Sequence, residues 1–131
     1  LTQVDATHAQ LTSMARSFTE RYGTFSTDAA FSNITDVYPV MSAAMLARSQ
    51  AYVQKAQTSR KATDPLTMTT TTVLSVQVFD VPFGAITASA TVKTQRSQIK
   101  GSDAPKTWYQ DLNLSFVKED GLWKVDSAVW K

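Results

Sequence analysis

The stretch that decides the fold of this chain is LSFVKEDGLWKVD at residues 114–126. In it Asp120 and Gly121 stand between two segments in which apolar and polar residues alternate. An Asp-Gly pair flanked in this way is the strongest short hairpin signal, because both central residues of a type I′ turn need positive φ angles. The stretch therefore predicts two antiparallel strands, over residues 107–118 and 122–130, joined by a two-residue loop.

The two-residue loop also predicts which residues lie opposite one another. Counting outward from Glu119 and Leu122 sets Phe116 against Val125. A three-residue loop would set Phe116 against the charged Lys124, so we favour the shorter loop. The same count, continued, gives the pairs Leu114–Ser127 and Leu112–Val129. The predicted inward face then consists of Leu112, Leu114, Phe116, Trp123, Val125, Ser127 and Val129, with no carboxylate among them.

The rest of the second half is also predicted as sheet. After Pro65 the apolar spacing changes from a helical period to a period of two, through residues 66–81. Residues 85–98 alternate most clearly, with an inward face of Ile86, Ala88, Ala90 and Val92. The threonine run at residues 69–72 is typical of an exposed strand, because threonine favours β geometry and tolerates water.

The first half is predicted to be helical. Apolar residues at helical spacing form one stripe: Val4, Leu11, Met14, Phe18 and Tyr22. Gly23 should end this helix, and Pro39 should break a second helical region that follows it. Ser42 is placed to cap a third helix, which runs out in the polar residues 57–61.

Composition bounds the class of protein. With 131 residues the chain is expected to form a single domain over residues 1–131. It has no Cys and one His, which leaves no disulfide scaffold and no thiolate metal site, and we expect neither a metal nor a cofactor. Its 13 Lys and Arg against 11 Asp and Glu are spread along the whole chain. Without a clustered basic face, a nucleic-acid partner is not expected.

Helices first and long antiparallel strands after them predict an α+β domain. The chain resembles the NTF2-like (cystatin-like cone) superfamily in its opening helix with Ala15-Arg16-Ser17-Phe18 and Tyr22, its broken helical middle, and its closing hairpin with Asp-Gly followed by Leu-Trp-Lys-Val. This resemblance spans nearly the whole chain. It implies N-terminal helices packed on a curved antiparallel sheet, but the superfamily holds enzymes, ligand binders and scaffold domains, so it does not select a function.

Candidates for acid–base chemistry are few. Enzymes of the superfamily that this chain resembles place acids, Tyr or His inside the cone. The only strand acid here on an apolar face is Asp80, beside a turn. We interpret Asp80 as a strand-end residue, and the lone His8 as a helix-surface residue without an acid partner. No nucleophile elbow, phosphate loop or zinc motif is present. We therefore name no catalytic residue and lean against an enzyme, without excluding one.

A ligand-binding cavity is a better hypothesis for a functional site than an acid–base centre. Ala88 and Ala90 are small inward residues that would leave space beneath the helices. The residues predicted to line that space are Tyr22, Tyr38, Tyr52, Arg96, Gln110 and Trp123, with Arg96 and Gln110 toward its mouth. The competing interpretation, which we prefer on sequence alone, is that the aromatic side chains fill the space as core.

The leading functional hypothesis is a non-enzymatic extracytoplasmic domain that acts in protein–protein assembly. Its architecture resembles bacterial VirB8-like secretion and conjugation subunits, in which a membrane anchor precedes an NTF2-like domain. The absence of an initial Met suggests that a membrane anchor preceded this chain. The domain is then expected in the periplasm or at the cell surface, with residues 1–7 as the end of a linker. The partners implied are other proteins or a second copy of the chain. Domains of this superfamily often dimerise through the outer sheet face, which here carries Ser89, Thr91, Lys93, Asn113 and Val117, and that face is polar enough to suit a monomer or a weak dimer. The alternative is a small-molecule binder, or an isomerase-like or dehydratase-like enzyme, that uses the cone.

Overall fold

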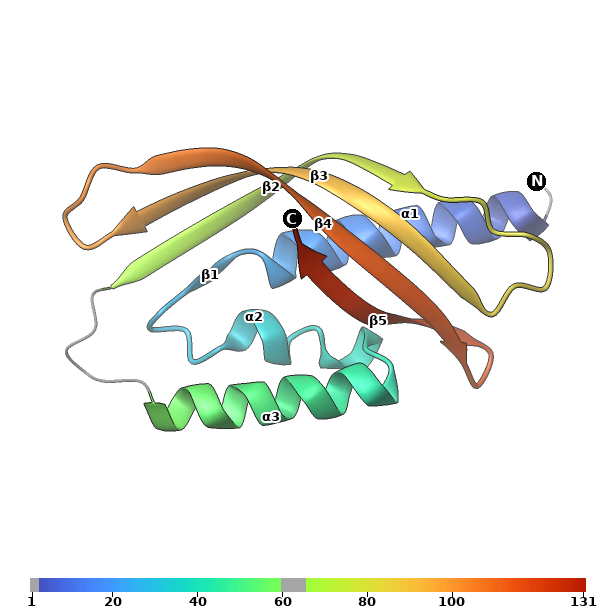
Figure 1. Cartoon of the computed structure of the whole chain (residues 1–131), viewed down its shortest axis with the longest axis horizontal. Coiled ribbons are helices and arrows are strands. Elements are labelled where there is room, and N and C mark those ends of the chain that lie inside the picture. The colour runs from blue at the N-terminus through green and yellow to red at the C-terminus, as the bar shows by residue number, and fades with distance from the viewer. Residues whose placement is uncertain (1–2, 60–65) are drawn as a thin grey trace.

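The computed structural model describes residues 3–59 and 66–131 and confirms an α+β fold with the helices first (Figure 1). The helical elements are α1 (Gln3–Tyr22), α2 (Ser32–Thr35), the 3₁₀ helix η1 (Tyr38–Val40) and α3 (Ala43–Ser59). The strands are β1 (Phe25–Ser26), β2 (Thr67–Val78), β3 (Thr87–Lys100), β4 (Lys106–Glu119) and β5 (Leu122–Trp130).

The helix boundaries follow from the predicted signals. Helix α1 ends one residue before Gly23, and Pro39 lies in η1, so the predicted break is confirmed. At the start of α3 the backbone N–H of Met45 donates to the Ser42 hydroxyl at 3.1 Å, which confirms the predicted cap. Residues 3–7, expected as the end of a linker, already belong to α1.

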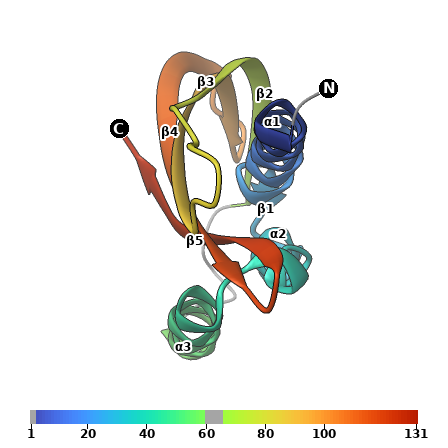
Figure 2. The same ribbon diagram turned by 90° about the vertical axis from the view of Figure 1, so that its right-hand side faces the viewer.

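The strands form one antiparallel sheet in the order β1-β2-β3-β4-β5, and the sheet is strongly curled (Figure 2). Helix α1 packs mainly on β2 and β3, while α3 contacts β5. The helices therefore cover the sheet at two separate places, with α2 and η1 between them (Figure 1).

The hairpin between β4 and β5 starts as predicted and then departs from the prediction. Asp120 and Gly121 have φ angles of 52° and 79°, and the pairs Glu119–Leu122 and Phe116–Val125 are confirmed. Beyond them the register shifts, because a β-bulge adds Asp126 to β5. The observed pairs after the bulge are Ser115–Ser127, Leu114–Ala128, Asn113–Val129 and Leu112–Trp130, so the pairs predicted for Leu114 and Leu112 are wrong.

The bulge changes which face of β5 looks inward. A shift of one residue moves every following side chain to the opposite face of a strand. Val129, predicted to be inward, is therefore 49% exposed, and Trp130 packs against the core instead. Asp126, which is not part of the predicted inward face, accepts a hydrogen bond from the buried Ser42 hydroxyl at 2.6 Å.

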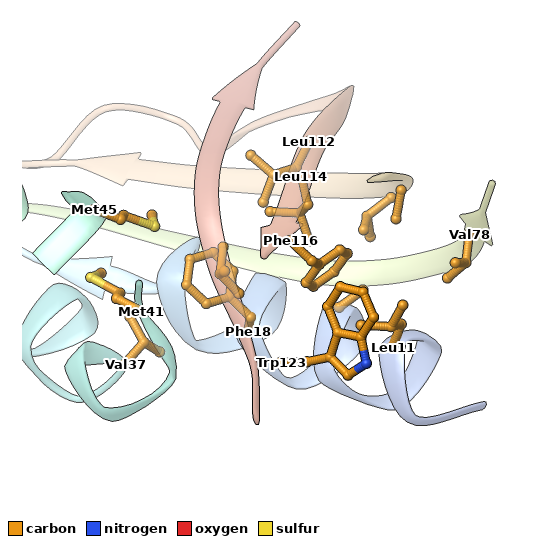
Figure 3. Close-up of a cluster of buried hydrophobic side chains, with 14 of the residues drawn as sticks. Leu11, Phe18, Val37, Met41, Met45, Val78, Leu112, Leu114, Phe116 and Trp123 are labelled. Carbon is orange, nitrogen blue, oxygen red and sulfur yellow. The ribbon is translucent and has the colours of Figure 1, made fainter. Parts of the chain in front are cut away.

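The hydrophobic core lies between α1 and the concave face of the sheet and continues to η1 and α3 (Figure 3). Figure 3 shows its main contributors: Leu11, Phe18, Val37, Met41, Met45, Val78, Leu112, Leu114, Phe116 and Trp123.

Two further expectations about the sheet are wrong. Ile86 precedes β3 and is 65% exposed, so the inward face of this strand starts with the half-buried Ala88. Thr69 and Thr71 are buried, and only Thr70 and Thr72 are exposed. The threonine run therefore has one buried and one exposed face, because α1 packs on one face of β2 and Thr71 Oγ1 donates to the carbonyl of Gly23, just after that helix.

Candidate functional site

A cavity of about 550 Å³ lies between the helical layer and the last strand. Helices α2 and α3, the end of α1, β1, β3 and β5 all contribute to its wall. Exposed Phe25 and Tyr52 lie on its rim, while Ile34, Met45 and Arg96 are buried wall residues. The volume falls within the roughly 300–1,000 Å³ range of small-molecule sites.

Arg96 is the charged residue with the most buried side chain in the described part of the chain, with 8% of its surface exposed. Its position on β3 follows the alternation of Ala90 and Val92, so its side chain enters the concave side of the sheet. The guanidinium donates three hydrogen bonds to neutral acceptors. They run from Nε to Thr71 Oγ1 at 3.0 Å, from Nη1 to Gln110 Oε1 at 2.9 Å, and from Nη2 to the Gly23 carbonyl at 3.4 Å.

Two tryptophan rings complete the surroundings of Arg96. Its guanidinium carbon lies 3.9 Å from the centroid of the Trp130 ring and 5.6 Å from that of Trp108. The Trp108 indole N–H also donates to Gln110 Oε1 at 3.1 Å, which fixes the amide that binds Arg96. Trp130 also lines the cavity, so the bulge in β5 helps to build this site.

Arg96 has no acidic counter-ion among the described residues. Within residues 3–59 and 66–131 the ion pairs are Arg21–Asp36 at 2.8 Å and Lys93–Asp111 at 3.8 Å. The positive charge of Arg96 is therefore stabilised by neutral oxygens and aromatic faces alone, a weaker compensation than a carboxylate gives.

The electrostatics of the cavity follow from burial. Burial lowers the pKa of Arg96, while Tyr22 opposes that shift. Burial also raises the pKa of Tyr22; Tyr52 adds to this rise and Arg96 reduces it. Tyr22 is thus electrostatically coupled to Arg96 within the same cavity.

The residues predicted to line the cone divide into three groups. Tyr22, Tyr52 and Arg96 are together in the cavity wall, and Gln110 lies behind Arg96 as its hydrogen-bond partner. Tyr38 is in η1, outside this wall, and Trp123 is buried in the hydrophobic core. The structure thus brings four of the six predicted residues into one site.

Asp80 and His8 do not join the cavity wall. Asp80 is exposed in the segment after β2. His8 is exposed on α1, and its Nε2 lies 3.3 Å from the carbonyl oxygen of Val78. The described wall residues include Arg48 and Arg96 but no Asp, Glu or His. Nor do the described ranges, 3–59 and 66–131, contain a group of three such residues suited to a metal ion.

Sequence reasoning missed Thr71, Gly23 and Trp130 as parts of the site. A signal existed for Thr71, because β-strand periodicity places alternate threonines on opposite faces. No comparable signal existed for Trp130, since its inward direction depends on the bulge.

Comparisons with known proteins bear on the fold. No protein-family model matches the chain, and no curated protein matches it. Among solved structures it is similar to CagV, a VirB8 homolog of the T4SS from Helicobacter pylori strain 26695, with a TM-score of 0.65 and 8% identity over 94% of this chain and 97% of that one. It is also similar to the intermembrane space region of the chloroplast protein ARC6, with a TM-score of 0.55 and 10% identity over 91% and 95% of the two chains.

These similarities, at such low identity, concern the fold. The chain has an NTF2-like fold that resembles a VirB8 homolog, which confirms the resemblance expected from the sequence. In the parts of the chain that the structure describes, no helix is both long and apolar enough to span a membrane.

Proposed function

We propose that this NTF2-like domain is a non-enzymatic, extracytoplasmic part of a membrane-anchored protein and acts in protein–protein assembly. The observation that carries the proposal is the whole-length structural match to a VirB8 homolog of a secretion system. Because the match covers nearly all of both chains, the two proteins share an entire domain rather than a common helix–sheet fragment. A secretion, conjugation or cell-envelope complex is the assembly that fits this likeness.

The arrangement of acids supports a binding role over catalysis. A general base must lie within hydrogen-bond reach of the substrate proton that it removes. The described cavity wall offers no carboxylate or imidazole for this task. Nearby acids are engaged elsewhere, as Asp126 is with Ser42 and Asp36 with Arg21.

The outer face of the sheet is the surface that we propose for self-association. Cross-strand polar contacts order its centre: Thr91 Oγ1 donates to Asn113 Oδ1 at 3.1 Å, and Lys93 pairs with Asp111. Tyr109 on the same face of β4 is 73% exposed and offers an aromatic contact beside this polar patch. Aromatic residues are enriched in protein interfaces.

Thiol chemistry in the producing cells tests the proposal, because the chain has no Cys and any introduced thiol is unique within it. The full-length protein would carry either Tyr109→Cys on the outer face or Ser17→Cys, an exposed control on α1. In intact cells a membrane-impermeant maleimide should label Ser17→Cys, which lies outside the proposed interface. Labelling that requires lysis would overturn the extracytoplasmic location.

The same two variants test assembly. Under mild oxidation Tyr109→Cys should give a disulfide-linked dimer, whereas Ser17→Cys should stay monomeric. Equal cross-linking of the two variants, or none at Tyr109→Cys, would contradict self-association through the outer face. The parent complex, solubilised in detergent, should also migrate at a larger mass than the free protein.

A further inference from the structure

We infer that the cavity binds a small amphipathic anion: a monocarboxylate with an apolar body, whose carboxylate pairs with Arg96. This ligand site is separate from the assembly role proposed above and rests on three features of the cavity: its buried cation, its apolar wall and its charge.

The first feature is the unused hydrogen-bonding capacity of Arg96. A guanidinium has five N–H donors. Three of them bind Thr71, Gln110 and Gly23, which leaves one N–H on each terminal nitrogen without a partner among the described residues. Two parallel N–H donors match the two oxygens of a carboxylate, and such two-pronged pairs are among the strongest hydrogen bonds in proteins.

The cost of burying Arg96 strengthens this argument. Charged side chains are almost never fully buried unless they are paired. Here the compensation comes from neutral oxygens and from the Trp130 face, and burial still lowers the pKa of Arg96. An anion in the cavity would supply the missing opposite charge beside a guanidinium that is already largely buried.

The second feature is the apolar part of the cavity wall. Ile34, Met45 and Phe31 line this part of the cavity. The Phe31 ring packs edge-on against Tyr52, with centroids 6.4 Å apart, which orders the aromatic side of the opening. These side chains suit a hydrocarbon or aromatic body, and a small hydrophilic anion would gain nothing from them.

The third feature is the charge of the opening. Arg48 on α3 also lines the cavity, and its Nη2 donates to the Asp126 carbonyl at 2.6 Å. Two arginines and no acid among the described wall residues make the cavity attractive to anions and unfavourable for cations.

A purely structural role for Arg96 is the competing explanation. Its three hydrogen bonds connect the end of α1, β2 and β4, so it also joins elements of the fold. The two explanations differ in their consequences, because a structural clamp has no preference for a ligand of either charge.

An NMR titration of the purified chain with decanoate, below the concentration at which it forms micelles, tests the inference. The three tryptophan indole signals act as internal reporters. Trp130 lines the cavity and should shift in a saturable way, whereas Trp123 lies outside its wall and should not. Decanol has the same chain without the charge and should bind at least tenfold more weakly; decylammonium should bind more weakly still.

Two kinds of variant separate binding from folding. Arg96→Met removes the charge and should weaken decanoate binding at least tenfold, while Arg96→Lys should retain part of it. If Arg96→Met fails to fold, Ser49→Trp remains as a test, since it leaves Arg96 intact and fills the cavity from α3. Gln50→Trp is its control, because Gln50 is an exposed neighbour outside the wall.

The inference is supported if decanoate shifts Trp130 and if Ser49→Trp, but not Gln50→Trp, abolishes the shift. It is overturned if decanoate does not bind, if decanol binds equally well, or if the shifts lie at Trp123. Failure of this experiment leaves the assembly proposal standing, because the thiol experiments do not depend on the cavity.

Discussion

The Arg96 guanidinium carbon lies 3.9 Å from the centroid of the Trp130 ring, so the last strand covers a buried cation with an aromatic face. A desolvated cation–π contact of this kind contributes up to about 2 kcal/mol. A double-mutant cycle with Arg96→Met and Trp130→Leu should therefore give a coupling free energy of about 1–2 kcal/mol in denaturant unfolding.

The Lys118–Trp123 pair is the matched control for that cycle. Its ammonium lies 5.8 Å from the ring centroid and its lysine is exposed. The cycle with Lys118→Met and Trp123→Leu should give about 0.5 kcal/mol or less. Equal coupling in the two cycles would show that burial of Arg96 adds nothing to its contact with Trp130.

Gly23 is predicted to be intolerant of any side chain. A Cβ atom at this position would lie 2.6 Å from Thr71 Oγ1 and 3.0 Å from the Thr19 carbonyl. Thr71 Oγ1 also accepts the hydrogen bond from Arg96 Nε, so the clash would disturb a contact that holds the Arg96 guanidinium in the cavity wall. Gly23→Ala should lower the free energy of unfolding by about 2–3 kcal/mol, as overpacking of a rigid site does.

Gly101→Ala is the control for backbone conformation alone. Gly101 has a φ of 58°, and a Cβ there would meet no atom within 4 Å. The variant should cost about 1 kcal/mol through left-handed strain. Urea unfolding of both variants decides the matter: if Gly23→Ala is no more destabilising than Gly101→Ala, the close approach to Thr71 has no energetic importance.

The parts of the fold that the sequence predicts correctly are those set by local chemistry. The Asp-Gly turn, the Ser42 cap and the break near Pro39 each depend on a few neighbouring residues. The bulge at Asp126 coincides with a long-range contact, because this residue accepts a hydrogen bond from Ser42, which is 84 positions away in the chain. Alternation within β5 alone could not reveal that contact.

The candidate site shows the same division. The sequence could place Arg96 on the inward face of its strand, because the period of two puts it on the same face as Ala90 and Val92. It could not predict the surroundings of this side chain, since Trp130 faces Arg96 only after the register shift and Gly23 comes from a distant turn. Periodicity thus finds which side chain enters the site, while tertiary contacts decide what surrounds it.

The Ser42 hydroxyl links the start of α3 to β5, and its removal should destabilise the protein. It accepts from the Met45 N–H at 3.1 Å and donates to Asp126 Oδ1 at 2.6 Å, in a fully buried position. Ser42→Ala loses the cap and leaves a carboxylate oxygen without its donor, so a loss of about 1–2 kcal/mol is expected.

Exposed Ser17 on α1 provides the comparison, and Ser17→Ala should change the unfolding free energy by no more than about 0.5 kcal/mol. Thermal and urea unfolding of both variants measure the difference. A Ser42→Ala protein as stable as Ser17→Ala would mean that the link to Asp126 does not hold α3 on β5.

Tyr22 should make the stability of the fold sensitive to alkaline pH. Its pKa is raised above the usual 10.0, first by burial and then by Tyr52, with Arg96 opposing. The folded state therefore holds the phenolic proton more tightly than the unfolded state does. By linkage, this contribution is fully present below about pH 10 and is lost as the pH rises through the folded pKa.

Tyr22→Phe removes the titrating hydroxyl, so its unfolding free energy should fall less steeply than that of the parent protein between about pH 9.5 and 11. Tyr109→Phe, which removes an exposed hydroxyl from β4, is the comparison variant for the loss of one tyrosine hydroxyl. Urea unfolding at a series of pH values gives the three slopes. If Tyr22→Phe keeps the parent slope, Tyr22 does not share the buried environment of Arg96, and the electrostatic description of the cavity fails at that residue.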